Sequence, residues 1–266
     1  MNKVLRLAQN TKGRDLVVGD IHGMFSMLNE ALKAIGFKPG IDRLISVGDL
    51  VDRGPESHVV ADWLACNWFF AALGNHDAQY AMEARRALFQ KEHGTRAIDP
   101  ASKYQWICNP FDTWYLELLS NDERNAVFSA LYHKTYPAIE IETAGGLVGV
   151  VHAAVPYGYN WESMRISMNN QDFGVIHRAI WERDFAHLAQ DETPIDESLF
   201  AVPDVLHVFH GHTVHPDCIH YSLANRHHID TGANMSRAPD KFPNAGFTIF
   251  DVTNPHTPLY YRSLAA

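Results

Sequence analysis

The sequence is poor in cysteine and lacks the features of several broad classes of protein. Its cysteines, Cys66, Cys108 and Cys218, are an odd number without CxxC spacing, so neither a disulfide framework nor a zinc knuckle is predicted. No apolar run approaches the roughly 18 residues of a membrane helix, and the first residues lack the apolar segment of a secretory signal. We therefore expect a cytoplasmic protein with no membrane partner.

Runs of basic residues are also missing, and the net charge is −9. A protein that binds a phosphate backbone usually carries a stripe or patch of Lys and Arg, so nucleic acid is not expected as a partner. The chain instead has 266 residues, of which 46% are hydrophobic and 20% charged. This composition is typical of a globular protein with a substantial core, and we expect a single domain over residues 1–266.

The first third of the chain alternates short apolar runs with amphipathic segments. The apolar runs are typical of buried strands, and the segments between them repeat their apolar residues at helical spacing. A β-α-β-α-β order implies parallel strands, whose carboxyl ends share one edge of a sheet. The predicted strands are residues 14–19, 43–48 and 68–73, and the predicted helices are residues 25–35 and 57–66.

Each of these strands ends in a glycine followed by a polar cluster. The clusters read "GDIHG" from residue 19, "GDLVDRG" from residue 48 and "GNHD" from residue 74. Their leading polar residues, Asp20, Asp49 and Asn75, are separated by 29 and 26 residues, and each separation suits one crossover unit. Ligands of open α/β sheets bind beyond the strand ends, so the three clusters are expected to converge.

The middle of the chain is less informative. A helical insert is predicted at roughly residues 80–135, where segments 111–119 and 121–134 carry helical periodicity. The stretch from Tyr157 to Phe173 has no regular pattern, and we expect a long loop there. Loops of this length are often functional.

Strand patterns return in the second half of the chain. We expect these strands to form a second β set that is more antiparallel than the first. The segments are residues 138–142, 147–151, 204–213, 227–234 and 246–252. The sequence therefore predicts an α/β fold with two groups of strands.

Six polar residues lie at or just past the end of a predicted strand, namely Asp20, His22, Asp49, Asn75, His152 and His212. One Asp or His in such a place is usually a cap or a satisfied buried group, but this does not explain six convergent positions. Two divalent ions roughly 3.5 to 4 Å apart need mixed oxygen and nitrogen ligands and a bridging carboxylate, for which Asp49 is placed. The sequence therefore predicts a dinuclear metal centre at the strand carboxyl ends.

The motifs as a set resemble those of a known family. "VVGDIHG", "ISVGDLVDRGP", "ALGNHD", "VVHA", "IWERD", "FHGHT" and "IDTGA" are similar to the metallophosphoesterases of the phosphoprotein phosphatase family, specifically the bacteriophage lambda type. The resemblance covers most of the chain and is weakest between roughly residues 80 and 135. It implies the calcineurin-like fold, a central β-sandwich flanked by helices. It also implies two divalent ions, usually manganese, with Fe, Zn, Ni or Mg as alternatives.

The resemblance implies a role for each motif residue. Asp20 and His22 should hold one ion, Asn75, His152 and His212 the other, and Asp49 should bridge them. Other histidines, such as His207 and His227, are assigned no metal.

Phosphate binding and proton transfer are assigned to other motif residues. Arg53 and Arg183 should hold the phosphate, because a guanidinium offers paired donors to its oxygens. His76 should be the general acid, oriented by Asp52. For Arg183 the alternative is a surface salt bridge with Glu182 or Asp184.

The implied reaction is hydrolysis of phosphate esters by a metal-bridging hydroxide, without a phosphoenzyme. The GxSxG, CxxxxxR and P-loop motifs of rival chemistries are missing. The expected substrate is a phosphorylated protein or peptide, with a serine/threonine or dual specificity.

Two alternatives remain open. One is a symmetrical diadenosine tetraphosphatase or another hydrolase of small phosphate esters or dinucleoside polyphosphates, because Asp77 stands where the lambda type has Glu. Tyr157, Tyr159 and Trp161 could then stack on a base, although such residues are more often packing anchors. The other is a metal-binding scaffold without turnover, against which the complete motif set counts.

Overall fold

The protein is described by a computed structural model that covers residues 1–104, 106, 119–191 and 196–262. The predicted helical segment 111–119 lies outside these residues except for Leu119. In the described part of the chain, no helix is both long and apolar enough to cross a membrane.

The first sheet confirms the predicted parallel core. Strands β2 (Asp15–Val18), β3 (Arg43–Ser46) and β4 (Phe69–Ala72) are parallel, and α1 (Phe25–Ala34) and α2 (Val60–Ala65) connect them. The six strands lie in the order β12-β11-β2-β3-β4-β5. The additional strands are β5 (Thr135–Tyr136), parallel to β4, and the antiparallel β11 (Phe247–Asp251) and β12 (Leu259–Tyr261).

The second sheet is not more antiparallel than the first, because among the described strands each sheet has three parallel and two antiparallel pairings. Three of its pairings are parallel, β1 with β6, β7 with β8, and β8 with β10. The segment predicted at 246–252 is β11, which pairs with β2 in the first sheet instead. The strands, in the order β1-β6-β7-β8-β10-β9, are β1 (Leu5–Leu7), β6 (Ile139–Thr143), β7 (Gly146–Val150), β8 (His207–His210), β10 (Arg226–His228) and β9 (Tyr221–Leu223).

The stretch from Tyr157 to Phe173 is not one long loop, because α5 (Trp161–Asn169) occupies its centre. The Asn160 side chain caps this helix by accepting from the backbone N of Ser163. The indole of Trp161 is buried and donates to Oε1 of Glu140, on β6, at 2.9 Å. Trp161 is thus a core residue, and the helix was overlooked because its apolar pattern is short.

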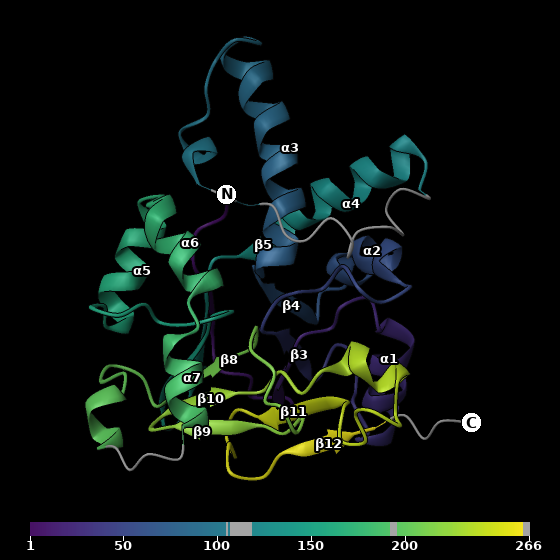
Figure 1. The fold of residues 1–266 in the computed structure, drawn as a ribbon, viewed down its shortest axis with the longest axis vertical. Coiled ribbons are helices and arrows are strands. Elements are labelled where there is room, and N and C mark those ends of the chain that lie inside the picture. Colours follow the sequence, from purple (N-terminus) through teal and green to yellow (C-terminus); the bar gives the residue numbers. More distant parts are fainter. Residues whose placement is uncertain (105, 107–118, 192–195, 263–266) are drawn as a thin grey trace.

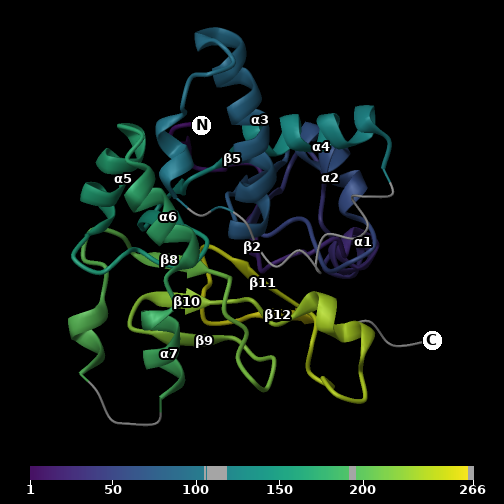
Figure 2. The ribbon, with the colours of Figure 1, turned by 45° about the horizontal axis from the view of Figure 1, so that its top comes forward.

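The remaining helices surround the two sheets. After α5 come α6 (Phe173–Trp181) and α7 (Asp184–Gln190). The insert region contains α3 (Asn75–His93) and α4 (Asn121–Lys134), and α3 begins within the "GNHD" motif. Figures 1 and 2 show α5, α6 and α7 on one flank of the sheets and α1 and α2 on the opposite flank.

The two sheets share a hydrophobic core. Side chains alternate along each strand, so Val17 of β2 faces the second sheet while Leu16 and Val18 pack with the helices. Ile45 and Phe250 of the first sheet and Phe209 of the second belong to the same buried cluster as Val17. This arrangement is the predicted sandwich flanked by helices, and it directs the carboxyl ends of β2, β3 and β4 to one edge.

We predict that Phe209→Ala lowers the free energy of unfolding by about 3 to 5 kcal/mol, because the ring is fully buried and contacts Phe250 at a centroid distance of 5.6 Å. Urea denaturation measures the change. Leu199→Ala is the control, because this side chain is 76% exposed, and it should shift stability by no more than about 0.5 kcal/mol. Equal effects of the two variants would contradict the assignment of this core.

Candidate metal and phosphate site

The loops that follow the strands turn with unusual backbone geometry. Five residues of these loops have positive φ angles without being glycine, a conformation that is strained and rare for L-residues. Such turns reverse the chain at the strand ends and direct side chains into one site. The residues are His22 (44°), Asp49 (50°), Asp52 (73°), Arg53 (64°) and His212 (70°).

Two glycines permit close approach at this edge. A Cβ atom added to Gly74 would collide with the carboxylate of Asp49, and one added to Gly211 would collide with the carboxylate of Asp20. Each glycine therefore makes room for a predicted ligand from a different loop.

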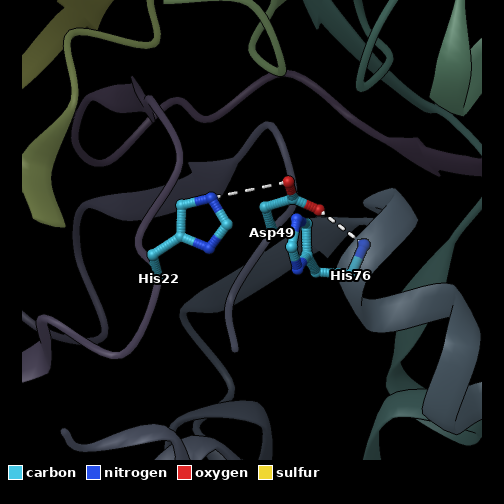
Figure 3. A group of neighbouring side chains, drawn as sticks. All are labelled: His22, Asp49 and His76. Carbon is cyan, nitrogen blue, oxygen red and sulfur yellow. Dashed lines mark hydrogen bonds and ion pairs between the residues drawn. The ribbon is translucent and has the colours of Figure 1, made fainter. Parts of the chain in front are cut away.

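Asp49 belongs to two groups of potential metal ligands. In the first, one ligand atom from each of His22, Asp49 and His76 lies within 4.8 Å of the others (Figure 3). In the second, the same holds for Asp49, His152 and His212. Oδ2 of Asp49 lies 3.6 Å from Nε2 of His22 and 3.4 Å from Nε2 of His152. A carboxylate between two sets of ligands is the geometry that a bridged pair of ions requires, although His76 of the first group is the predicted general acid and not a predicted ligand.

The ring orientation of three histidines fits metal binding. Nδ1 of His22 donates to the carbonyl of Val51 at 2.9 Å, and Nδ1 of His152 donates to that of Val47 at 3.0 Å. Nε2 of His212 donates to the carbonyl of Trp181 at 3.3 Å. In the neutral ring each contact leaves the other nitrogen unprotonated and available, as the carbonyl partners of metal-bound histidines do.

The electrostatics of these rings agree with that orientation. Burial lowers the pKa of His22 and His212 well below the ordinary value. Both rings are therefore neutral at pH 7, the state in which imidazole binds a metal.

The remaining predicted ligands occupy different positions around these groups. Oδ1 of Asn75 lies 3.0 Å from Nε2 of His152, next to the second group. Asp20 is part of neither group, although its Oδ2 lies 4.0 Å from Nε2 of His22 and it accepts from the backbone N of His212 at 3.1 Å. The structure thus brings all six predicted ligands together, with Asp20 the most peripheral.

Asp230 is a site residue that the sequence reasoning missed. It lies in "IDTGA", just past β10, is 2% exposed and forms a side-chain hydrogen bond with Asp20. Burial, followed by the charges of Asp230 and Asp49, raises the pKa of Asp20 well above its ordinary value. The signal that could have found Asp230 is the same strand-then-acid pattern that identified Asp20.

His76 is held by a hydrogen-bonded carboxylate. Its Nδ1 lies 2.6 Å from Oδ2 of Asp52, and the hydroxyl of Tyr80, another residue that was not predicted, donates to Oδ1 of Asp52 at 2.7 Å. Burial by itself lowers the pKa of His76, but the charges of Asp49 and Asp52 and the bond to Asp52 outweigh it, so the pKa is raised. Arg53 opposes that rise. The carboxylates around the ring thus make its protonation easier than burial alone would allow.

The two predicted phosphate-binding arginines reach the site from different elements. Nη1 of Arg53 lies 2.8 Å from Nε2 of His22, and Nη2 lies 3.1 Å from Nε2 of His76. Arg183, between α6 and α7, donates to the carbonyl of His212 at 3.1 Å. Glu182 pairs with Arg178 at 3.1 Å, so it is not committed to Arg183 as the surface alternative would require.

Asp77 joins two of the loops. Its Oδ1 accepts from the backbone N of Leu50 at 2.9 Å, and its Oδ2 accepts from that of Gly74 at 3.1 Å. It is fully buried, and burial together with Asp49 raises its pKa to about 7. Asp77, which stands where the lambda type has Glu, therefore connects the loop after β3 to the loop after β4.

Comparison with models of known protein families assigns the chain to one of them. The family model of calcineurin-like phosphoesterases matches residues 14–216. The chain belongs to that family, whose members hydrolyse phosphate esters at a centre of two divalent metal ions, and the residues above supply candidate ligands for one.

Named relatives fall into two groups. The chain is 30% identical over 219 residues to a protein of Salmonella typhimurium named serine/threonine-protein phosphatase 1, which covers 82% of this chain and 85% of that one. It is 45% identical over 168 residues to a symmetrical bis(5'-nucleosyl)-tetraphosphatase of Shewanella, covering 63% and 52%. A serine/threonine phosphatase structure from Saccharomyces cerevisiae has a TM-score of 0.60 at 14% identity, covering 99% and 84%, and shows the shared fold.

We predict that Asp77→Ala lowers the free energy of unfolding by about 2 to 6 kcal/mol, because it leaves two buried backbone donors without an acceptor. Chemical denaturation in the presence of chelator measures this without a contribution from bound metal. Asp77→Asn keeps one acceptor oxygen and should lose about half as much. An alanine variant as stable as the wild type would show that the carboxylate does not hold the loops.

Proposed function

We propose that the protein is a metal-dependent serine/threonine protein phosphatase that acts on phosphorylated proteins or peptides. The observation that carries the proposal is the carboxylate of Asp49, which lies between Nε2 of His22 and Nε2 of His152, with His76 and Arg53 beside it. A relative named as a protein phosphatase aligns with 82% of the chain, which supports this substrate class. A cytoplasmic location and a single domain over residues 1–266 remain predictions.

In this proposal Asp49 would be shared by the two ions, and five other residues would complete the ligand set. Asp20 and His22 would hold one ion, and Asn75, His152 and His212 would hold the other. The mixture of carboxylate, amide and imidazole donors suits manganese, the metal we favour. When bound, the ions activate water and neutralise phosphate charge.

The protein's own groups do the rest of the chemistry. Arg53 and Arg183 bind the phosphate oxygens, because the guanidinium of Arg53 lies beside His22 and that of Arg183 contacts the carbonyl of His212. His76 carries a proton at Nε2 and transfers it to the leaving alkoxide. Asp52 fixes the ring by its contact with Nδ1, and Tyr80 fixes Asp52 in turn.

A dinucleoside tetraphosphatase is the second candidate, and the relatives of that name support it. The structure weakens one argument for it. Of the three aromatic residues that were candidates for base stacking, Trp161 is buried in the core and Tyr159 is partly buried, with the guanidinium of Arg178 over its ring at 5.8 Å. Only Tyr157, at 74% exposure, presents most of its ring to solvent.

We predict that His76→Asn lowers kcat for a phosphoserine peptide by about 10²- to 10⁴-fold, because the variant lacks the proposed proton donor for the poor leaving group. The loss should be much smaller for p-nitrophenyl phosphate, whose leaving group needs no proton. Calorimetric Mn²⁺ binding provides the control and should keep its stoichiometry. Wild-type turnover of the phosphopeptide by this variant would remove His76 from the role of general acid.

The substrate class is tested by measuring kcat/KM for a phosphoserine peptide and for diadenosine tetraphosphate in parallel, with Mn²⁺, with Mg²⁺ and with chelator. We expect Mn²⁺-dependent hydrolysis of the peptide, abolished by chelator, to exceed hydrolysis of the dinucleotide. A preference for the dinucleotide would overturn the protein phosphatase assignment and keep the reaction class. No hydrolysis of either substrate by protein shown to hold both ions would overturn the proposal as a whole.

A further inference from the structure

A second group of histidines lies on the second sheet, separate from the site described above. His207 begins β8 and His227 lies in β10, both on the face that packs against the first sheet. The ring of His227 lies 5.2 Å from that of Phe209 and 6.3 Å from that of Phe250, which belong to the core between the sheets. His256 approaches from the connection between β11 and β12, seen in yellow in Figure 1.

Two ring nitrogens of this group converge. Nδ1 of His207 lies 2.9 Å from Nε2 of His227. Two nitrogens bound to one tetrahedral zinc ion at the usual bond length are about 3.3 Å apart, so a shift of a few tenths of an ångström makes the pair chelating. The ring proton between them would move to the outer nitrogen of His207 by tautomer exchange.

The ring nitrogen of His227 that points away from His207 has a contact of the kind that metal-bound histidines make. Nδ1 of His227 lies 3.0 Å from Oγ of Ser222, on β9; in the tautomer in which Nδ1 donates to this hydroxyl, Nε2 is the ligand atom. Burial lowers the pKa of His207, and burial with the neighbouring His207, His256 and His220 lowers that of His227 to about 3. The imidazoles are therefore neutral and able to bind a metal at pH 7.

A third donor can join the pair only after its side chain rotates, because the three rings do not yet bring their ligand atoms within 4.8 Å of one another. The ring of His256 lies 6.0 Å from that of His207 between centroids, at an interplanar angle of 87°. His256 is exposed, so its side chain can rotate toward the pair without disturbing the core. Because β11 and β12 belong to the first sheet, an ion held here would link the two sheets.

From this geometry we propose that His207, His227 and His256 form a site for one transition-metal ion such as Zn²⁺, Ni²⁺ or Cu²⁺. The donor set is imidazole alone, which suits these ions and not Mn²⁺ or Mg²⁺, whose preferred ligands are oxygens. The Asp49 site instead offers carboxylate and amide oxygens as well as imidazole nitrogens. The two sites should therefore be distinguished by the choice of metal.

The test is calorimetric titration of the full chain with Zn²⁺ and, separately, with Mn²⁺. The wild type should bind one more Zn²⁺ per chain than a variant carrying both His207→Gln and His256→Gln, while the two proteins bind the same number of Mn²⁺ ions. The single variant His256→Gln, which changes an exposed side chain, should weaken the additional Zn²⁺ site by at least about tenfold. Zn²⁺ should also raise the Tm of the wild type more than that of the double variant.

The matched control is His93→Gln, which removes an exposed histidine of α3 and should leave every Zn²⁺ parameter unchanged. Equal Mn²⁺ binding by the double variant shows that its fold and its Asp49 site are intact. Equal Zn²⁺ stoichiometry in the wild type and the folded double variant would overturn the proposal. This outcome is independent of phosphatase activity, because no residue of the Asp49 site is altered.

Discussion

The carboxylate of Asp49 is the contact on which the arrangement of the site depends. Its Oδ1 accepts from the backbone N of His76, which positions the start of α3, and its Oδ2 lies between the nitrogens of His22 and His152. The segments that follow β2, β3, β4 and β7 therefore meet around one side chain. Gly74 is required next to it, because any side chain there would displace the carboxylate. The two carboxylate oxygens of Asp49 thus position both the backbone at the start of α3 and the histidines His22 and His152.

Buried negative charge is the cost of this arrangement. Asp20, Asp49, Asp52, Asp77 and Asp230 are each at most 2% exposed. Burial first, and the neighbouring carboxylates after it, raise the pKa of Asp20 and of Asp77, whereas the histidines around Asp49 hold its pKa well below the ordinary value despite its burial. Arginine side chains, imidazoles and divalent ions are the groups that compensate such charge. The fold is consequently suited to bind cations where its strands end, and a phosphate dianion where those cations lie.

Much of the fold and site could be predicted because the relevant patterns are local. The strands β2, β3 and β4 each carry their apolar run and the following polar cluster within about ten residues. The structural features that the sequence did not predict are of another kind. β1 is three residues long, α5 is a short helix whose Trp161 is anchored by Glu140, and β11 pairs with β2 from the far end of the chain. Short elements and distant pairings depend on tertiary contacts, which periodicity does not report.

The sequence by itself determined the class of fold, the family and the identity of the motif residues, because strand ends, glycine turns and metal-binding side chains recur at characteristic spacings. Only the tertiary structure decided which residues touch. It brought Tyr80 to Asp52 and Asp230 to Asp20, and it placed His207 beside His227 at the edge of the core. The reason is that such contacts depend on strand register and loop curvature, which are set by the packing of the whole chain rather than by neighbouring residues.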